Sequence, residues 1–202
     1  MTKLAALVFP GFELLDLFGP LELFGSVDAD INIAITSGQQ GPVGSTQGPR
    51  VMTDCLLKEA LDAELFLIPG GPGIRNQIRN EDLLGWLNES AKTADMMMSV
   101  CTGSALLAAA GLLDGRRATT NKLSFSRVAR TGKNTQWIKQ TRWVEDGKYW
   151  TSSGVSAGMD MALAVIERKF GRDCAKKAAI YAEYDWHNNP DWDPFAEIHG
   201  LV

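Results

Sequence analysis

One cysteine, followed directly by threonine and glycine, is the strongest candidate for chemistry in this sequence. Cys101, Thr102 and Gly103 lie in the segment SVCTGSALLAAAGLL, between an apolar run and a run of small residues typical of a helix. A thiolate is a strong nucleophile, and a helix N-terminus lowers the pKa of a thiol placed there. A cysteine at a strand-to-helix turn can therefore act as the serine of a hydrolase elbow does. Free cysteine is also among the most buried residue types, so position alone leaves a structural cysteine equally open.

Two acids in one apolar segment are candidates for exchanging a proton with such a thiol. Asp16 lies within Leu14–Phe18, and Glu22 follows six residues later. A carboxyl group that is buried must be paired or must have a shifted pKa, and either change suits acid–base work. Each acid taken alone reads more simply as a surface residue of an amphipathic helix.

A glycine-rich loop is the third candidate. The run PGGPG, Pro69–Gly73, follows an apolar segment, and glycines there allow backbone N–H groups to face an anion. No Gly-Lys-Ser or Gly-Lys-Thr follows, so a phosphate-binding loop is excluded. A tight turn explains the loop equally well when it is considered by itself.

Other polar segments have simpler explanations. The small residues of Thr151–Gly158 suit a helix cap, and the polar and aromatic run Asp185–Trp192 suits a packed tail. His187 and His199 are the only histidines, so no histidine cluster is available for a metal and a Cys–His pair is hard to build. The base that serves Cys101 is therefore expected to be a carboxylate.

The elements that must position these residues follow an alternating pattern of short apolar runs and helical stretches. Strands are expected over Leu4–Phe9, Asp30–Thr36, Glu64–Ile68, Met96–Val100, Arg117–Thr120, Thr141–Glu145 and Tyr149–Thr151, and helices over Phe12–Ser26, Asp82–Ala91, Ser104–Gly111, Phe125–Arg130 and Gly158–Phe170. A loop or hairpin is expected up to Arg50. This alternation predicts an α/β fold with a mainly parallel, buried sheet over a single domain, residues 1–202. Ligands of such sheets bind at the C-terminal ends of strands, where the cysteine and the glycine loop lie.

Composition narrows the class of protein. The 202 residues carry a net charge of −4, which argues against a nucleic-acid partner. No apolar run approaches the roughly 20 residues that cross a bilayer, and the N-terminal apolar run is too short for a signal peptide. Three cysteines without a CxxC pair indicate neither a disulfide framework nor a zinc site. A cytoplasmic protein without a membrane partner is expected.

Four segments together resemble the DJ-1/PfpI (ThiJ) superfamily, and within it the isonitrile hydratase-like branch. They are LLDLFGPLELF (14–24), FLIPGGPG (66–73), SVCTGSALLAAAGLLDGRRATTN (99–121) and TSSGVSAGMDMAL (151–163), and they span most of the chain. The cysteine segment is the specific one, because a Pro-Gly-Gly loop is common elsewhere. The resemblance implies a flavodoxin-like sandwich with helices on both faces of the sheet, a nucleophile elbow at Cys101, and a homodimer.

The resemblance also implies an activity and roles for five residues. Cys101 would attack the terminal carbon of an isonitrile, R–N≡C, and water would then release an N-substituted formamide from the thioimidate. Asp16 would be the acid–base partner, and Thr102, directly after the nucleophile, would supply a backbone or hydroxyl contact. Glu22 stays a possible secondary acid on the evidence of the residues alone. Gly70 and Gly71 would line the pocket that stabilises negative charge. The substrate is a small molecule, and no cofactor or metal is implied.

One position departs from the family pattern and keeps alternatives open. Many relatives carry histidine where this chain has Asn121, which weakens a protease or amidase mechanism based on a Cys–His pair. A small-molecule or redox sensor built on Cys101 is an alternative, as is glyoxalase-like or hydrolytic chemistry at the same cysteine. Some regulators attach a helix-turn-helix module to this domain; the chain has no room for one, so direct DNA binding is not expected.

Overall fold

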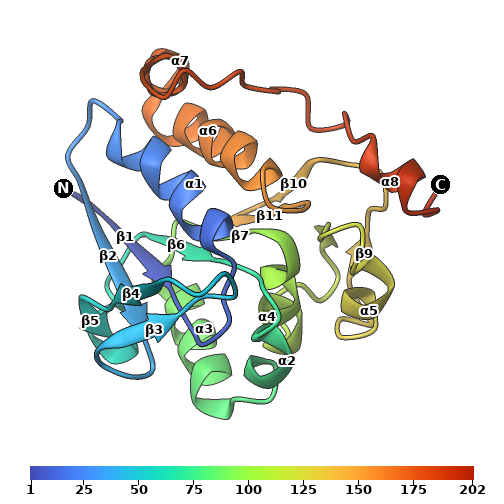
Figure 1. Ribbon diagram of the computed structural model, residues 1–202, viewed down its shortest axis with the longest axis horizontal. Helices are drawn as coiled ribbons and strands as arrows, with labels where there is room; N and C mark the ends of the chain where they lie inside the picture. Colours follow the sequence, from blue (N-terminus) through green and yellow to red (C-terminus); the bar gives the residue numbers. More distant parts are fainter.

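A seven-stranded sheet lies between two layers of helices in the computed structural model, which describes residues 1–202 (Figure 1). The strand order is β10-β11-β7-β6-β1-β2-β5, and every neighbouring pair is parallel except β10 and β11. The strands are β1 (Thr2–Leu7), β2 (Ile31–Ser37), β5 (Cys55–Leu56), β6 (Leu65–Ile68), β7 (Met96–Ser99), β10 (Trp143–Asp146) and β11 (Tyr149–Ser152). The predicted α/β fold with a mainly parallel sheet is confirmed.

Helices cover both faces of the sheet. In Figure 1 α1, α6 and α7 lie on one face, and α2, α3 and α4 lie on the other. The helices are α1 (Leu14–Gly25), α2 (Ile74–Gln77), α3 (Glu81–Thr93), α4 (Ser104–Ala109), α5 (Phe125–Ala129), α6 (Ala157–Phe170), α7 (Arg172–Tyr181) and α8 (Phe195–Ile198), with short 3-10 turns η1 (Leu57–Glu59) and η2 (Cys101–Gly103). None of these helices is both long and apolar enough to cross a membrane.

The central strands are apolar throughout because both of their faces are covered. All four residues of β6 are buried, and β7 is buried beyond its first residue. On the α3 face, the ring of Phe66 meets Trp86 edge to face, with 5.6 Å between centroids. The Asn80 side chain caps α3 by accepting from the Leu83 N–H at 3.3 Å.

Several elements differ from the prediction. The hairpin before residue 53 exists, as β3 (Pro42–Gly44) and β4 (Arg50–Met52). The strand expected over Arg117–Thr120 is only β8 (Arg117–Ala118), and it pairs with the unpredicted β9 (Gln136–Trp137) outside the main sheet. Helix α7 was also not predicted. Gly171, at φ +95°, ends α6 and starts this mostly polar helix, whose buried residues are all alanines.

Candidate active site

The backbone turns sharply at Cys101. Strand β7 ends at Ser99, Val100 is still extended, and Cys101 adopts φ +56° as it begins η2, which leads into α4. Positive φ is uncommon for residues other than glycine, and such strain gathers at functional sites. The side chain is 7% exposed. The predicted strand-to-helix elbow is thus present, with its cysteine in a strained conformation.

Neighbouring segments hold this turn in place. The Cys101 N–H donates to the Ser153 carbonyl at 3.0 Å, and the Cys101 carbonyl accepts from the Thr120 hydroxyl at 2.9 Å. Gly103 packs against the end of β6, where a Cβ would lie 2.3 Å from the Ile68 carbonyl oxygen. The elbow therefore requires glycine two residues after the cysteine, because any side chain would push α4 away from β6.

Asp16 is fully buried on α1 and faces the elbow. Its Oδ2 accepts from the Gly70 N–H at 2.9 Å, whereas its Oδ1 is buried without a conventional hydrogen bond. Burial raises the pKa of Asp16 from its ordinary 3.8 to about 7, and the charge of Glu13 adds to the rise. Hydrogen bonds from the Gly70 amide and the Cys101 thiol act in the opposite direction on this pKa. The carboxyl group is therefore poised to gain or lose a proton near neutral pH.

The pKa of the Cys101 thiol is also raised, chiefly by burial and next by the negative charge of Asp16. The backbone N–H groups of Thr102 and Val155 lower this pKa, but they do not outweigh burial. Burial and the charge of Asp16 therefore oppose the lowering of the thiol pKa that was expected from the helix N-terminus. Asp16 and Cys101 form a coupled pair, and both side chains resist carrying a charge at once.

The glycine loop positions Asp16 and Thr102. The Gly70 N–H is bound to Asp16, and the Gly71 N–H donates to the Thr102 hydroxyl oxygen at 3.0 Å. An anion at this loop would have to displace these acceptors. The N–H groups beside the sulfur instead belong to Thr102 and Val155. Val155, at φ +33°, belongs to the run Thr151–Gly158, for which the sequence favoured a helix cap over a pocket lining.

Gly70→Ala is expected to disturb the site strongly, because the added Cβ would lie 2.6 Å from both the Thr102 nitrogen and its Oγ1. A clash with backbone in a packed core costs about 1–3 kcal/mol of unfolding free energy. The matched control is Gly85→Ala on α3, where no atom lies within 4 Å of the new Cβ. That change should stabilise the protein by roughly 0.5–1 kcal/mol. Urea denaturation of both variants checks this, and equal stabilities would contradict the described packing.

The acid expected as a secondary partner is not at the site. Glu22 is exposed on α1 and lines a surface depression with Phe18 and Tyr181. The second acid near the pair is Glu13, which is half-buried and whose charge raises the pKa of both Asp16 and Cys101. Glu13 occupies the N-cap position of α1, and its N–H donates to the Gly70 carbonyl at 2.9 Å.

A cavity of about 270 Å³ opens beside the elbow. It is lined by Asn121, Lys122, Leu123, Ser153, Gly154, Val155, Ser156, Phe195 and His199. The lining segment 153–156 includes Ser153, whose carbonyl accepts from the Cys101 N–H, and Val155, whose N–H lowers the pKa of the Cys101 thiol. Asn121 accepts from the Ser124 N–H at 3.0 Å through its side-chain oxygen. His199, to which the sequence analysis gave no role, shares this cavity with Asn121.

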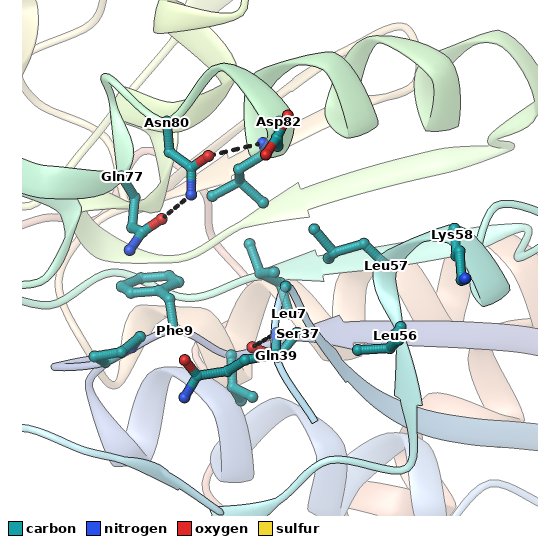
Figure 2. Close-up of a pocket in the computed structure, with 14 residues that line it drawn as sticks. Leu7, Phe9, Ser37, Gln39, Leu56, Leu57, Lys58, Gln77, Asn80 and Asp82 are labelled. Carbon is teal, nitrogen blue, oxygen red and sulfur yellow. Dashed lines mark hydrogen bonds between the residues drawn. The ribbon is translucent and has the colours of Figure 1, made fainter. Parts of the chain in front are cut away.

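A larger cleft of about 520 Å³ lies elsewhere on the same sheet edge, at the ends of β1, β2 and β5 (Figure 2). Its polar lining includes Gln77 and Asn80, whose side chains bond to each other at 2.9 Å, together with Ser37 and Gln39. No cysteine or histidine lines it. No group of three or more His, Cys, Asp or Glu side chains anywhere in the structure is arranged to hold a metal ion.

Comparisons with known proteins agree with this geometry. Residues 2–168 match the model of the DJ-1/PfpI family. The isonitrile hydratase of Pseudomonas putida is 31% identical over 182 residues, which cover 90% of this chain and 78% of the relative. A deglycase of Thermococcus kodakarensis is 29% identical over 75% of this chain and 89% of its own. A ThiJ/PfpI family protein from Pseudomonas syringae, 29% identical, superposes with a TM-score of 0.85 over 95% of this chain and 78% of its own.

These relatives share a fold, but the names they carry describe more than one activity. The family match extends across the segments that hold Asp16, the glycine loop, Cys101 and most of α6. It therefore includes the whole coupled pair and the N–H groups around it. The chain belongs to the DJ-1/PfpI family.

Proposed function

We propose that the protein is a cysteine enzyme that adds water to an isonitrile and releases an N-substituted formamide. The observation that carries the proposal is the buried pair of Cys101 and Asp16, in which the thiol lies beside a carboxyl group with a pKa of about 7. An isonitrile carbon must be attacked and protonated, and this pair offers a nucleophile and a proton carrier together. The chemistry calls for no metal or organic cofactor.

In the first half of the reaction, the Cys101 sulfur attacks the terminal carbon of R–N≡C. The C–S bond forms as the thiol proton passes to the Asp16 carboxylate and from there to the same carbon. The product is a thioimidate, R–N=CH–S, attached to Cys101. Moving one proton within the pair avoids forming a free thiolate in a buried site, where burial and Asp16 disfavour it.

In the second half, water attacks the thioimidate carbon. Asp16 accepts a proton from the water as the C–O bond forms and passes this proton to the nitrogen, which restores the carboxylate. The C–S bond then breaks, R–NH–CHO leaves, and the sulfur regains its proton from the new hydroxyl group through Asp16. The Thr102 and Val155 N–H groups stabilise negative charge on the departing sulfur.

Turnover of p-nitrophenyl isocyanide, followed by absorbance and by identification of the formamide, tests this proposal. The protein should convert the isonitrile, and the product should carry oxygen from labelled water. Absence of turnover by protein whose Cys101 is confirmed to be reduced would overturn the hydratase proposal.

The same experiment can test two alternative functions of Cys101, a different enzyme activity and redox sensing. Because one relative carries the name deglycase, glycated compounds are the second substrate class to test for glyoxalase-like or hydrolytic chemistry at Cys101. A redox sensor would instead convert Cys101 to sulfinic acid in peroxide, with Asp16 in its protonated form donating a hydrogen bond to it. The raised thiol pKa and the low exposure both argue against fast oxidation.

We also propose that the protein acts on a small cytoplasmic molecule as a homodimer formed through α1 and α7. Four large apolar side chains lie exposed on these neighbouring helices: Leu15, Phe18, Ile180 and Tyr181. Exposed apolar patches on soluble proteins mark interaction surfaces. Light scattering should give twice the 22.0 kDa chain mass, and Phe18→Glu should give the monomer. A monomeric wild-type protein would contradict the dimer.

A further inference from the structure

The last residues of the chain lie against the cavity that opens beside Cys101. Phe195 and His199 from α8 line this cavity together with Leu123 and Val155. Figure 1 shows α8 at the C-terminal end of the chain, apart from α1, α6 and α7, and its Phe195 and His199 share the cavity with residues 153–156, which follow β11. Phe195 is 45% exposed and Leu123 is 77% exposed. Two large apolar side chains thus line a cavity whose wall includes Ser153, the residue that accepts from the Cys101 N–H.

A buried ion pair fixes this segment. The Lys122 Nζ lies 3.0 Å from the Asp193 Oδ2, and both side chains are 1% exposed. The other oxygen of Asp193 accepts from the Phe195 N–H at 3.0 Å. Lys122 also donates to the Thr119 hydroxyl at 2.7 Å. The position of Phe195 is therefore determined by the loop that lies next to Cys101, and not by free movement of a tail.

The same loop connects the tail to the elbow. Thr120, two residues before Lys122, donates its hydroxyl to the Cys101 carbonyl at 2.9 Å. Earlier in the tail, the Pro190 carbonyl accepts from the Arg142 N–H and, at 2.8 Å, from the Thr141 hydroxyl. These contacts hold α8 and the Cys101 backbone on one connected framework, so the cavity that Phe195 lines has a defined size.

We propose that the C-terminal segment from Asp193 to His199 is the outer wall of the substrate site, and that Phe195 selects reagents carrying one aromatic ring. An apolar cavity of about 150 Å³ holds a benzene ring, so the 270 Å³ cavity has room for a single substituted ring. Phe195, Leu123 and Val155 supply the apolar contacts, and Asn121 and His199 offer polar groups to a ring substituent. That the substrates are aryl isonitriles rests on the proposed function. That Cys101 reacts preferentially with reagents carrying one aromatic ring does not depend on it.

The test uses Phe195→Ala, with Ile198→Ala as the matched control. Ile198 lies on the same helix, is 70% exposed and does not line the cavity. The first readout is the ratio of kcat/KM for phenyl isocyanide to that for methyl isocyanide. Loss of the ring contact should lower this ratio about 10-fold or more in Phe195→Ala and leave it unchanged in Ile198→Ala.

The second readout needs no hydratase activity. Cys101 is alkylated by N-phenylmaleimide or by iodoacetamide in a background with Cys55 and Cys174 replaced by serine. With the maleimide, an alkene carbon bonds to sulfur, the thiol proton goes to water, and the neighbouring carbon takes up a proton from water. With iodoacetamide, the CH₂ carbon bonds to sulfur as iodide leaves and the thiol proton goes to water. The rate ratio of the two reagents should fall in Phe195→Ala and not in Ile198→Ala.

The outcomes separate the two proposals. If the protein hydrates no isonitrile but Phe195→Ala still changes the alkylation ratio, the hydratase proposal fails and the proposal that Phe195 forms the wall of the site stands. Unchanged ratios in both readouts would overturn the wall. A shift of Phe195→Ala to a different oligomeric state, seen by light scattering, would also overturn it, because Phe195 would then face a second copy.

Discussion

Replacement of Cys101 by alanine is expected to abolish formation of the formamide. Without sulfur no thioimidate forms, and removal of a covalent nucleophile lowers kcat by about 10⁴-fold or more. The variant should fold normally, because the change removes one atom from a side chain that is 7% exposed. Product analysis at high enzyme concentration, with circular dichroism of the same sample, measures both effects.

Cys174→Ala is the matched control for this change. Cys174 is a second free cysteine, partly buried on α7, and it takes no part in the elbow. Its replacement should leave turnover unaltered. Equal loss of activity in both variants would show that thiol content, and not the position of Cys101, supports the reaction.

Asp16→Asn is expected to lower turnover and raise stability at the same time. The amide keeps an oxygen for the Gly70 N–H but can no longer carry the proton between sulfur and carbon. Loss of a positioned acid–base group costs about 10²–10⁴-fold in rate. Turnover of the same aryl isonitrile measures this loss. Glu22→Gln, an exposed acid on the same helix, is the control and should retain full activity.

The gain in stability of Asp16→Asn should depend on pH. A carboxyl group whose pKa rises from 3.8 to about 7 on folding costs the folded protein on the order of 4 kcal/mol once the pH exceeds 7. Below about pH 4 the group is protonated in both folded and unfolded protein, so the cost disappears. The stability difference between wild type and Asp16→Asn should therefore grow from pH 4 to pH 7 and then level off.

Urea denaturation at pH 4.5, 6 and 8 measures that difference. The amide needs a partner for its own N–H groups, so the gain at pH 8 should reach about 1–3 kcal/mol, below the full electrostatic cost. A variant less stable than wild type at pH 8 would show that the buried carboxylate stabilises the fold. Enzymes commonly contain strained or charged active-site groups, such as a buried carboxylate, that lower the stability of the fold.

The elbow was predictable from sequence because its determinants are local. An apolar strand, one cysteine and a run of small residues lie within fifteen consecutive positions, and Gly103 meets the strand that the glycine loop follows. The parallel sheet was predictable for a similar reason, because β6 and β7 are apolar on both faces. The choice between the two acids could not be made from helical periodicity alone. Asp16 and Glu22 look alike in sequence, and only packing shows that one is buried and the other exposed.

The cavity wall was not predictable from local patterns. Phe195 and His199 lie more than ninety residues after Cys101 in the sequence, and an ion pair between Lys122 and Asp193 brings them to the site. Two separated charges give no periodic signal, because a buried pair looks like two surface residues. The sequence also could not show that the Gly70 and Gly71 N–H groups already have hydrogen-bond acceptors, because these acceptors lie on other elements.

The central claim is that isonitrile carbon becomes bonded to Cys101 during turnover. Acid quenching of the wild-type protein within the first turnovers on an aryl isonitrile, followed by peptide mass spectrometry, tests it most directly. The peptide that contains Cys101 should gain the full mass of the isonitrile, as expected for a thioimidate, and the adduct should decay at the rate at which formamide appears. Formamide production without any adduct on this peptide, and at an unchanged rate in Cys101→Ala, would contradict the account.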